Sequence, residues 1–194
     1  HPKVLGVGWI GEGDYKAKVN GKMTPEYNYW FRMMRRCYQE GYKDFMYYKD
    51  VIVCEDWHNF QNFAIWFTDI YNKDTIKKWD LDKDILVKGN KLYSESTCLF
   101  VPREVNTLLT KNNMVRGELP VGVMYSKSGL KYVAQISMFK EIIRLGSFST
   151  AEEAFYTYKT AKELHIKEVA NKWIDKIDPR AYEALMNYQV EITD

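Results

Sequence analysis

The sequence predicts a mixed α+β fold, with helices and short strands in separate stretches of the chain. Two stretches, residues 25–40 and 56–67, place apolar side chains at the spacing of a helix face. A third, residues 121–148, contains three strand-like runs separated by short turns, and a helical pattern follows it. With 194 residues and 46% hydrophobic composition, the chain can form one large domain or two small ones, each with a packed core.

The first zone, up to about residue 48, should contain a short strand and a helix. Residues 15–19 alternate in polarity as a strand does. Thr24 and Pro25 make a good helix start, because threonine can accept a hydrogen bond as N-cap and proline suits the first helical position. The helix should end before Gly41. Its expected apolar face consists of Tyr27, Trp30, Met34 and Cys37.

Positive charge is concentrated in two parts of the chain, although the net charge is only +2. Residues 16–43 hold seven basic and two acidic side chains, a balance of +5, and residues 111–148 hold six and two, a balance of +4. Residues 150–194 hold six basic and nine acidic side chains, a balance of −3. The positive parts are candidates to contact phosphate. In the first helix the candidates are Arg32, Arg35 and Arg36, for which an ordinary solvated face is an equal alternative.

The second zone, residues 50–110, should begin with a strand at 51–54 and continue with a helix capped by Asp56. His58 falls in this helix, and a packing or surface role is expected for it. Two strands follow, one carrying Asp82 and one opening at Thr97, before a helix near Pro102. Polar residues 111–120 then read as a linker, so the predicted domains are residues 1–110 and 121–194. The buried stripe of the first of these helices should be Phe60, Phe63, Ala64 and Phe67.

The third zone should form three antiparallel strands packed on one helix. The strands are expected at residues 121–125, 132–138 and 142–148. Ser149 and Glu152 predict a capping box at the start of the helix, and Asp178 with Pro179 predicts a final short helix. Strand alternation directs one set of side chains toward the helix and leaves another set exposed. The buried set is Tyr132, Ala134, Ile136 and Met138, and the exposed set is Lys131, Val133, Gln135 and Ser137.

The exposed face suits a nucleic acid, although an ordinary solvated sheet face is the alternative. Glutamine can pair bidentately with adenine and arginine with guanine, which makes Gln135 and Arg144 candidates for base contacts. Lysines suit phosphate oxygens. The candidates for that role are Lys127, Lys131 and Lys140.

The third zone resembles the APETALA/ethylene-response-factor type of DNA-binding domain. The matching motifs are GV at 122–123, YVAQI at 132–136, LGSF at 145–148 and TAEEA at 150–154, followed by Tyr158 and AK at 161–162. The resemblance covers roughly fifty residues and implies that the three-stranded sheet enters the major groove of double-stranded DNA. The contacts it implies are residues 124–127, Lys131, Gln135, Ser137 and Arg144. The chain has fewer arginines on this face than plant members of the family.

The second zone resembles the HNH nucleases encoded by bacteriophages, including the homing kind. The resemblance rests on VCEDWHNFQNFAIWF at 53–67, LDKD at 81–84 and NKLYSESTCLFVPREVN at 90–106. It implies an HNH-like ββα region with a divalent metal, Mg²⁺ or Mn²⁺, and a general base. The implied positions are Asp82 as metal ligand, Lys83 as base, Thr97 on the second strand and Asn106 in the closing helix.

The residues Lys83 and Thr97 do not suit the cleavage of DNA. A lysine with an ordinary pKa near 10 is protonated at neutral pH and cannot act as a base, and threonine is a weaker ligand than an amide or carboxylate. Asp84 and Glu104 could substitute as metal ligands, since Asp82 and Asp84 should share one face of a strand while Lys83 points away. The alternative is that this Asp–Lys–Asp triplet is an ordinary surface strand end.

The leading hypothesis is therefore a phage-type protein that binds double-stranded DNA and carries a degenerate HNH-like region. The alternatives are a metal-dependent homing endonuclease or nickase, and a phage inhibitor that binds a host protein. An intracellular location, in the host cytoplasm for a phage protein, is expected because three cysteines without paired spacing indicate neither a disulfide framework nor a zinc site. No membrane segment is expected, because no run of about eighteen apolar residues occurs.

Overall fold

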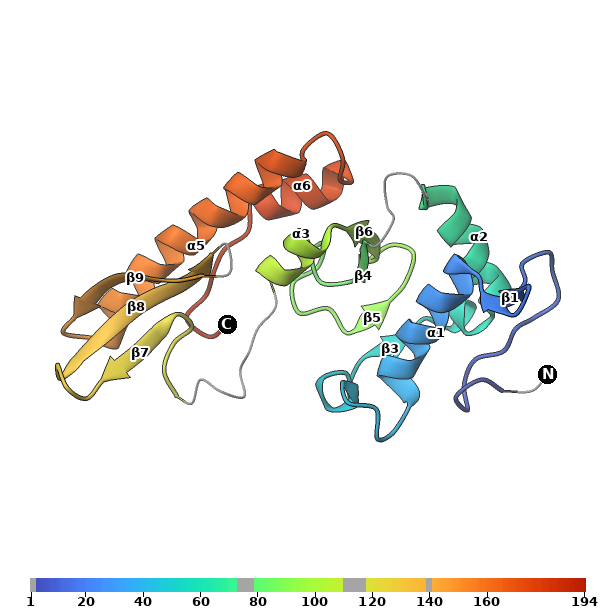
Figure 1. The fold of residues 1–194 in the computed structure, drawn as a ribbon, viewed down its shortest axis with the longest axis horizontal. Coiled ribbons are helices and arrows are strands. Elements are labelled where there is room, and N and C mark those ends of the chain that lie inside the picture. Colours follow the sequence, from blue (N-terminus) through green and yellow to red (C-terminus); the bar gives the residue numbers. More distant parts are fainter. Residues whose placement is uncertain (1–2, 73–78, 110–117, 139–140) are drawn as a thin grey trace. The chain divides into compact units, whose positions relative to one another are not determined.

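The computed structural model describes residues 3–72, 79–109, 118–138 and 141–194 and confirms a mixed α+β fold (Figure 1). The chain divides into two compact units, residues 1–103 and 104–194, and each is described by itself. Most of the linker predicted at 111–120 falls on residues 110–117, outside the described residues.

The first unit is built around helix α1 (Pro25–Tyr38), which begins and ends as predicted. The hydroxyl of Thr24 accepts a hydrogen bond from the Tyr27 N–H, and Trp30 lies at the centre of the apolar face with no exposed surface. A hairpin of β1 (Lys18–Val19) and β2 (Lys22–Met23) precedes the helix. It is shorter than the strand predicted from residue 15, because the Tyr15 N–H donates to the side chain of Gln61 instead of to a neighbouring strand.

Helix α2 (Phe60–Ile70) buries the predicted aromatic stripe, but its start was predicted wrongly. A 3-10 turn, η2 (Glu55–His58), comes first, so Asp56 and His58 lie before the helix. The N-cap is Asn59, whose side-chain oxygen accepts a hydrogen bond from the Gln61 N–H at 3.1 Å. Both asparagine and aspartate cap helices well, and the sequence offered both within four residues.

Four short strands complete the first unit's regular structure, together with the 3-10 turn η1 (Phe45–Tyr47). β3 (Ile52–Val53) pairs in parallel with β5 (Leu92–Tyr93), and β4 (Asp80–Asp82) pairs antiparallel with β6 (Leu99–Val101). Helix α3 (Arg103–Leu108) follows β6. The strand predicted to open at Thr97 begins two residues later, because Thr97 closes a turn in which its N–H donates to the Ser94 carbonyl at 3.2 Å.

The second unit contains the predicted three-stranded antiparallel sheet, in the order β7 (Val123–Ser126), β8 (Lys131–Met138), β9 (Glu141–Phe148). Helix α5 (Ala151–Trp173) packs along one face of this sheet (Figure 1). Ala134 and Ile136 from β8 meet Phe155 and Tyr158 from α5 in the core. The capping box lies one residue later than predicted, with Thr150 and Glu153 exchanging the two hydrogen bonds.

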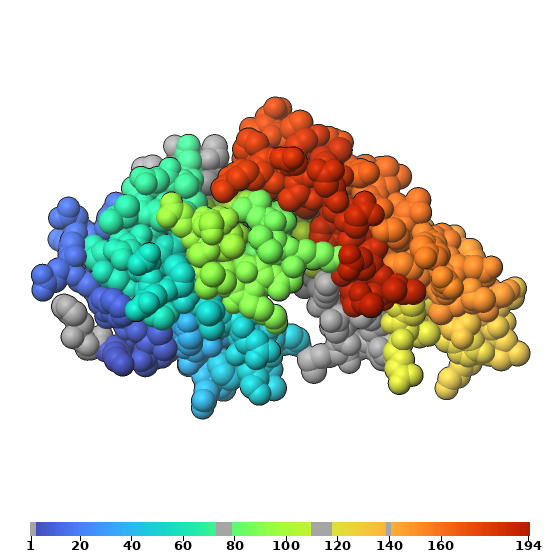
Figure 2. Space-filling view, turned by 180° about the vertical axis from the view of Figure 1, so that it is seen from behind, coloured from blue at the N-terminus to red at the C-terminus, as the bar shows by residue number. Residues whose placement is uncertain are grey.

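The end of the chain is tied back to α5. After helix α6 (Pro179–Met186), capped by Asp178 as predicted, the last residues run beside α5, red against orange in Figure 2. The Lys159 ammonium donates to the Val190 carbonyl at 2.7 Å, and the Val190 N–H donates to Glu163 at 2.8 Å. None of the helices in the described ranges combines the length and apolar character needed to cross a membrane.

His165 on α5 makes the stability of the second unit sensitive to acid. Burial of its ring, followed by the charge of Lys162, lowers the pKa of His165 below its usual 6.5, against the opposing effects of Glu168 and Glu104. The unfolded chain therefore binds more protons than the folded chain as the pH falls through about 6.5, and stability is lost over that range. We expect the denaturant midpoint to fall between neutral pH and pH 5, and His165→Gln to reduce that fall. An equal fall in both proteins would contradict the assignment.

Candidate functional site

The face of the β7-β8-β9 sheet that points away from α5 carries several of the predicted site residues. The strand register places Gln135 directly opposite Arg144, and Ser137 opposite Ile142. On the other side of β8, Lys131 lies opposite Ser126. Side chains alternate along a strand, so these residues lie on the face opposite Ala134 and Ile136, which pack in the core.

A β-bulge in β9 determines which side chains share this face. Ala134 and Gln135 are consecutive on β8, but their partners on β9 are Gly146 and Arg144, so Leu145 is an extra residue. Because of it, Arg144 and Ser147 lie on the same face although they are three residues apart. The Arg144 guanidinium donates a hydrogen bond to the Ser147 hydroxyl. Period-two alternation could not predict Ser147 as a site residue, and Gly146 is the only signal of the irregularity in the sequence.

The residues predicted to be exposed on this face are at least partly exposed in the structure, except for Val133. Lys131, Ser137 and Arg144 are exposed and Gln135 is half-buried, but Val133 is only 4% exposed. Val133 lies in the middle of the central strand, between Met124 on β7 and Ser147 on β9, which enclose it. Lys127 is exposed in the turn between β7 and β8. Lys140 lies outside the described residues.

This sheet face carries cationic, amide and apolar side chains close together. It combines cations for phosphate with an amide and a guanidinium that can each form two hydrogen bonds to a base edge. Two apolar side chains also remain open on it, Met124 at 42% and Ile142 at 72% exposure. Apolar groups at such positions can contact the methyl group of thymine.

The three arginines of α1 do not form one open basic patch. Arg32 is exposed, but Arg35 donates to the Tyr42 hydroxyl at 3.1 Å and lies 4.3 Å from the centre of that ring. Arg36 lies over the rings of Tyr48 and Tyr93, and its Nε is buried. Of the two interpretations of these arginines, phosphate contact or an ordinary solvated face, the solvated face does not describe Arg36, because aromatic rings from distant segments cover it.

Asp82 holds a turn at the end of β4. Its side chain is nearly buried, and Oδ1 accepts hydrogen bonds from the N–H groups of Asp84 and Ile85, both at 2.8 Å. Burial raises the pKa of Asp82, while these two hydrogen bonds oppose the rise. The expectation that Asp82 and Asp84 share a strand face was wrong, because the strand ends at Asp82 and the chain turns there.

Lys83 closes the same loop from inside. It was expected to point away from the face shared by Asp82 and Asp84, but it pairs with Asp84, and only 6% of its surface is exposed. Its ammonium donates to both carboxylate oxygens of Asp84 at 2.8 Å and to the Asn90 carbonyl at 2.7 Å. The Asn90 side chain donates in turn to the carbonyls of Lys83 and Leu92. The Lys83 ammonium therefore holds this loop together through three acceptor atoms.

The remaining predicted catalytic residues are also engaged in local structure. The Thr97 hydroxyl lies 2.8 Å from the Leu92 carbonyl and 2.9 Å from the Ser94 hydroxyl. Asn106 lies half-buried on α3. Glu104 accepts hydrogen bonds from the Lys172 ammonium and, at 2.8 Å, from the indole of Trp173, all within the second unit.

The carboxylates of this loop make contacts within the protein. One oxygen of Asp82 accepts hydrogen bonds from two backbone N–H groups, and Asp84 is paired with Lys83. Within the described ranges no three histidine, cysteine or acidic side chains come together where they could hold a metal ion. His58 lies 3.4 Å from the Tyr38 hydroxyl and edge-on to Trp9, which is the packing role expected for it.

The exposed sheet face is thus the better developed of the two candidate sites, since its polar groups point outward while those of the Asp82 loop are used internally. No protein-family model, curated protein or solved structure matches this chain.

Proposed function

We propose that the chain binds double-stranded DNA through the outer face of the β7-β8-β9 sheet. The observation that carries the proposal is the cross-strand pair of Gln135 and Arg144 on the face that α5 leaves uncovered. An adenine-reading amide beside a guanine-reading guanidinium can distinguish adjacent base pairs in the major groove. The hydrogen bond from Arg144 to Ser147 holds the guanidinium in place before DNA arrives, which reduces the entropy lost on binding.

The surrounding charges support the same proposal. Lys131 begins β8 and Lys127 lies in the preceding turn, so two exposed cations flank the Gln135–Arg144 pair on one side. Such cations contact phosphates and fix the orientation of a protein on the duplex without reading sequence. The resemblance of residues 121–173 to the APETALA/ethylene-response-factor type of domain is consistent with this use of the sheet.

Fluorescence anisotropy with a labelled duplex tests the proposal. We expect affinity to fall steeply between about 50 and 200 mM salt, because phosphate contacts release counterions. Arg144→Ala should weaken binding to the preferred sequence by about 5–150-fold, equivalent to about 1–3 kcal/mol. Lys131→Ala should weaken binding to all sequences and reduce the salt slope by about one.

Lys176→Ala is the matched control. It removes one exposed positive charge from the turn after α5, within the same unit but away from the sheet face, and should change affinity little. The proposal fails if a double Gln135→Ala, Arg144→Ala variant binds duplex DNA as tightly as the wild type while remaining folded by circular dichroism.

Metal-dependent cutting is a second candidate, resting on one observation. β4 and β6 pair antiparallel with Asp82 opposite Leu99, β5 lies between them in the chain, and α3 follows β6; this pairing ahead of a helix supports the comparison with HNH nucleases. The internal hydrogen bonds of Asp82 and Lys83 weigh against it. The variant pair that separates the two roles of Asp82 is described in the Discussion.

A further inference from the structure

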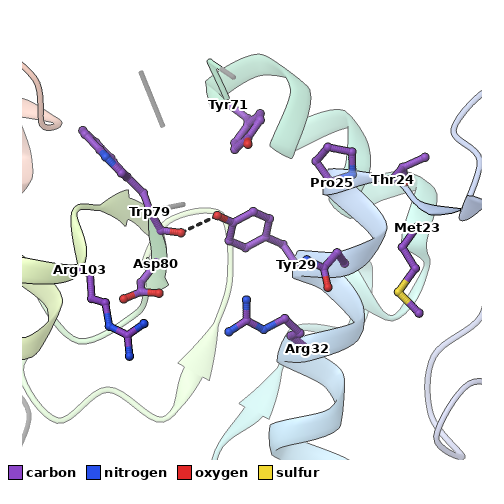
Figure 3. A pocket seen from close by; sticks show the side chains of 10 residues that line it. Met23, Thr24, Pro25, Tyr29, Arg32, Tyr71, Trp79, Asp80 and Arg103 are labelled. Carbon is purple, nitrogen blue, oxygen red and sulfur yellow. Dashed lines mark hydrogen bonds between the residues drawn. The ribbon is translucent and has the colours of Figure 1, made fainter. Parts of the chain in front are cut away.

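The first unit contains a polar pocket that neither proposed site uses. It has a volume of about 710 Å³, within the range of small-molecule sites. Its walls come from three separate parts of the unit: the start of α1, the end of α2, and the β4 and α3 termini (Figure 3). The side chains that give it chemical character are Tyr29, Arg32, Tyr71, Trp79, Asp80 and Arg103.

One end of the pocket is cationic. Arg32 and Arg103 are both exposed, and in Figure 3 the Arg103 guanidinium lies just below the Asp80 carboxylate and the Arg32 guanidinium lies to its right. Within the described part of the chain, neither arginine makes a hydrogen bond or ion pair. Asp80 is not free, because it already takes part in a polar or other interaction. Two guanidinium groups facing one carboxylate leave a net positive charge, and their planar forks match the oxygens of a phosphate.

The other end is aromatic. The Tyr29 hydroxyl donates to the Trp79 carbonyl, and this hydrogen bond joins α1 to the start of β4. In Figure 3 the Tyr71 ring and the Trp79 indole lie on the opposite side of this bond from the two guanidinium groups. Tyr71 is held in position by stacking on Phe67, with ring centres 4.3 Å apart. A base can stack on aromatic faces of this kind.

We infer that this pocket binds a single nucleotide unit, with the phosphate at Arg32 and Arg103 and the base against Tyr71 and Trp79. The two arginines alone would accept any anion, and the aromatic rings alone would accept many apolar groups. Because the arginines and the aromatic rings lie at opposite ends of one pocket, the pocket favours a ligand with an anionic group at one end and a planar ring at the other. A nucleotide in a single DNA strand and a free nucleotide share this chemistry.

Isothermal titration of the full chain with deoxyadenosine monophosphate tests the inference. We expect saturable binding that is at least about tenfold tighter than that of deoxyadenosine or of inorganic phosphate, since each of these lacks one of the two recognised groups. Arg32→Ala and Arg103→Ala should each weaken nucleotide binding by about tenfold or more, because each removes charge-assisted hydrogen bonds. Asp80→Asn should tighten it, because the variant removes the one negative charge among the described residues that line the pocket.

Each alternative result has a definite meaning. Absence of nucleotide binding, or phosphate binding as tight as that of the nucleotide, overturns the inference, and so does unchanged affinity in both arginine variants. Tighter binding of a short single-stranded oligonucleotide than of the mononucleotide identifies the strand as the source, and the reverse order identifies the free nucleotide. Arg144→Ala separates this site from the sheet: it should impair duplex binding and leave nucleotide binding unchanged, so either proposal can fail alone.

Discussion

Gly122→Ala is expected to destabilise the second unit by about 2–5 kcal/mol, a large part of the stability of a typical domain. Gly122 immediately precedes β7 and has a φ of +74°, a conformation that costs an alanine about 1–2 kcal/mol. A Cβ at this position would also lie 2.0 Å from Cδ2 of Tyr158, so the ring must move. Tyr158 is buried in the core between α5 and the sheet, where forced repacking costs about 1–3 kcal/mol more.

Substitutions at two other glycines separate the cost of backbone strain from the cost of displacing Tyr158. Gly21 has a φ of +76° and an added methyl group would have nothing within 4 Å, so Gly21→Ala should cost only the backbone strain of about 1–2 kcal/mol. At Gly129 the nearest atom is the Ser126 hydroxyl at 3.6 Å, and Gly129→Ala should be nearly neutral. Urea unfolding followed by circular dichroism measures all three. A Gly122→Ala protein no less stable than Gly21→Ala would show that Tyr158 yields without cost.

Asp82→Ala is expected to destabilise the first unit by about 3 kcal/mol, because the N–H groups of Asp84 and Ile85 lose their acceptor. Ile85 is buried, and a buried donor left without a partner costs about 1–3 kcal/mol. Asp82→Asn retains an oxygen that can accept both hydrogen bonds, so this variant should remain within about 1 kcal/mol of the wild type. Urea unfolding of the two variants measures the difference.

The same pair of variants decides between a structural and a metal-binding Asp82. We expect no nicking of plasmid DNA by the wild type with Mg²⁺ or Mn²⁺, because the carboxylate serves the turn. Nicking by the wild type that disappears in a fully folded Asp82→Asn protein would establish the endonuclease instead. An amide fits the turn but is a much poorer ligand for a hard divalent cation than a carboxylate.

Asp82 also has a predictable effect on the pH dependence of stability. Burial raises its pKa above the usual 3.8, so the folded chain binds more protons than the unfolded chain between the two values. The contribution of Asp82 to stability therefore decreases as the pH rises from about 3.8 through the raised pKa. Asp82→Asn should remove this decrease, which pH-dependent unfolding of the two proteins can measure.

Local patterns predicted the elements that depend on local chemistry. The Thr24 cap, the Trp30 face of α1 and the Phe63 face of α2 follow from spacing within a single helix. The three strands of the second unit follow from alternation and turn residues. Errors of a few residues occur at the caps, where two suitable residues stand close together and the preceding turn selects one, as Asn59 was selected over Asp56.

The candidate sites were harder to predict than the helices and strands, because they depend on contacts between segments that are distant in the sequence. A solvated position was one of the interpretations that the sequence left open for Arg36 and Lys83. In the structure, the rings of Tyr48 and Tyr93 cover Arg36, and the Asn90 carbonyl accepts a hydrogen bond from Lys83. A long cationic side chain can lie inside when acceptors and rings from elsewhere surround it, and a single element carries no information about them.

The sequence by itself determined the α+β class, the main helix faces and the choice of Gln135 and Arg144 as candidate residues of one sheet. Only the tertiary structure decided that a bulge at Leu145 adds Ser147 to their face, that Asp82 serves a turn, and that Arg32 and Arg103 line one pocket. The physical reason is the range of the interactions. Periodicity and capping act within a few residues, whereas a site is formed where backbone register and packing bring together residues that the sequence keeps far apart.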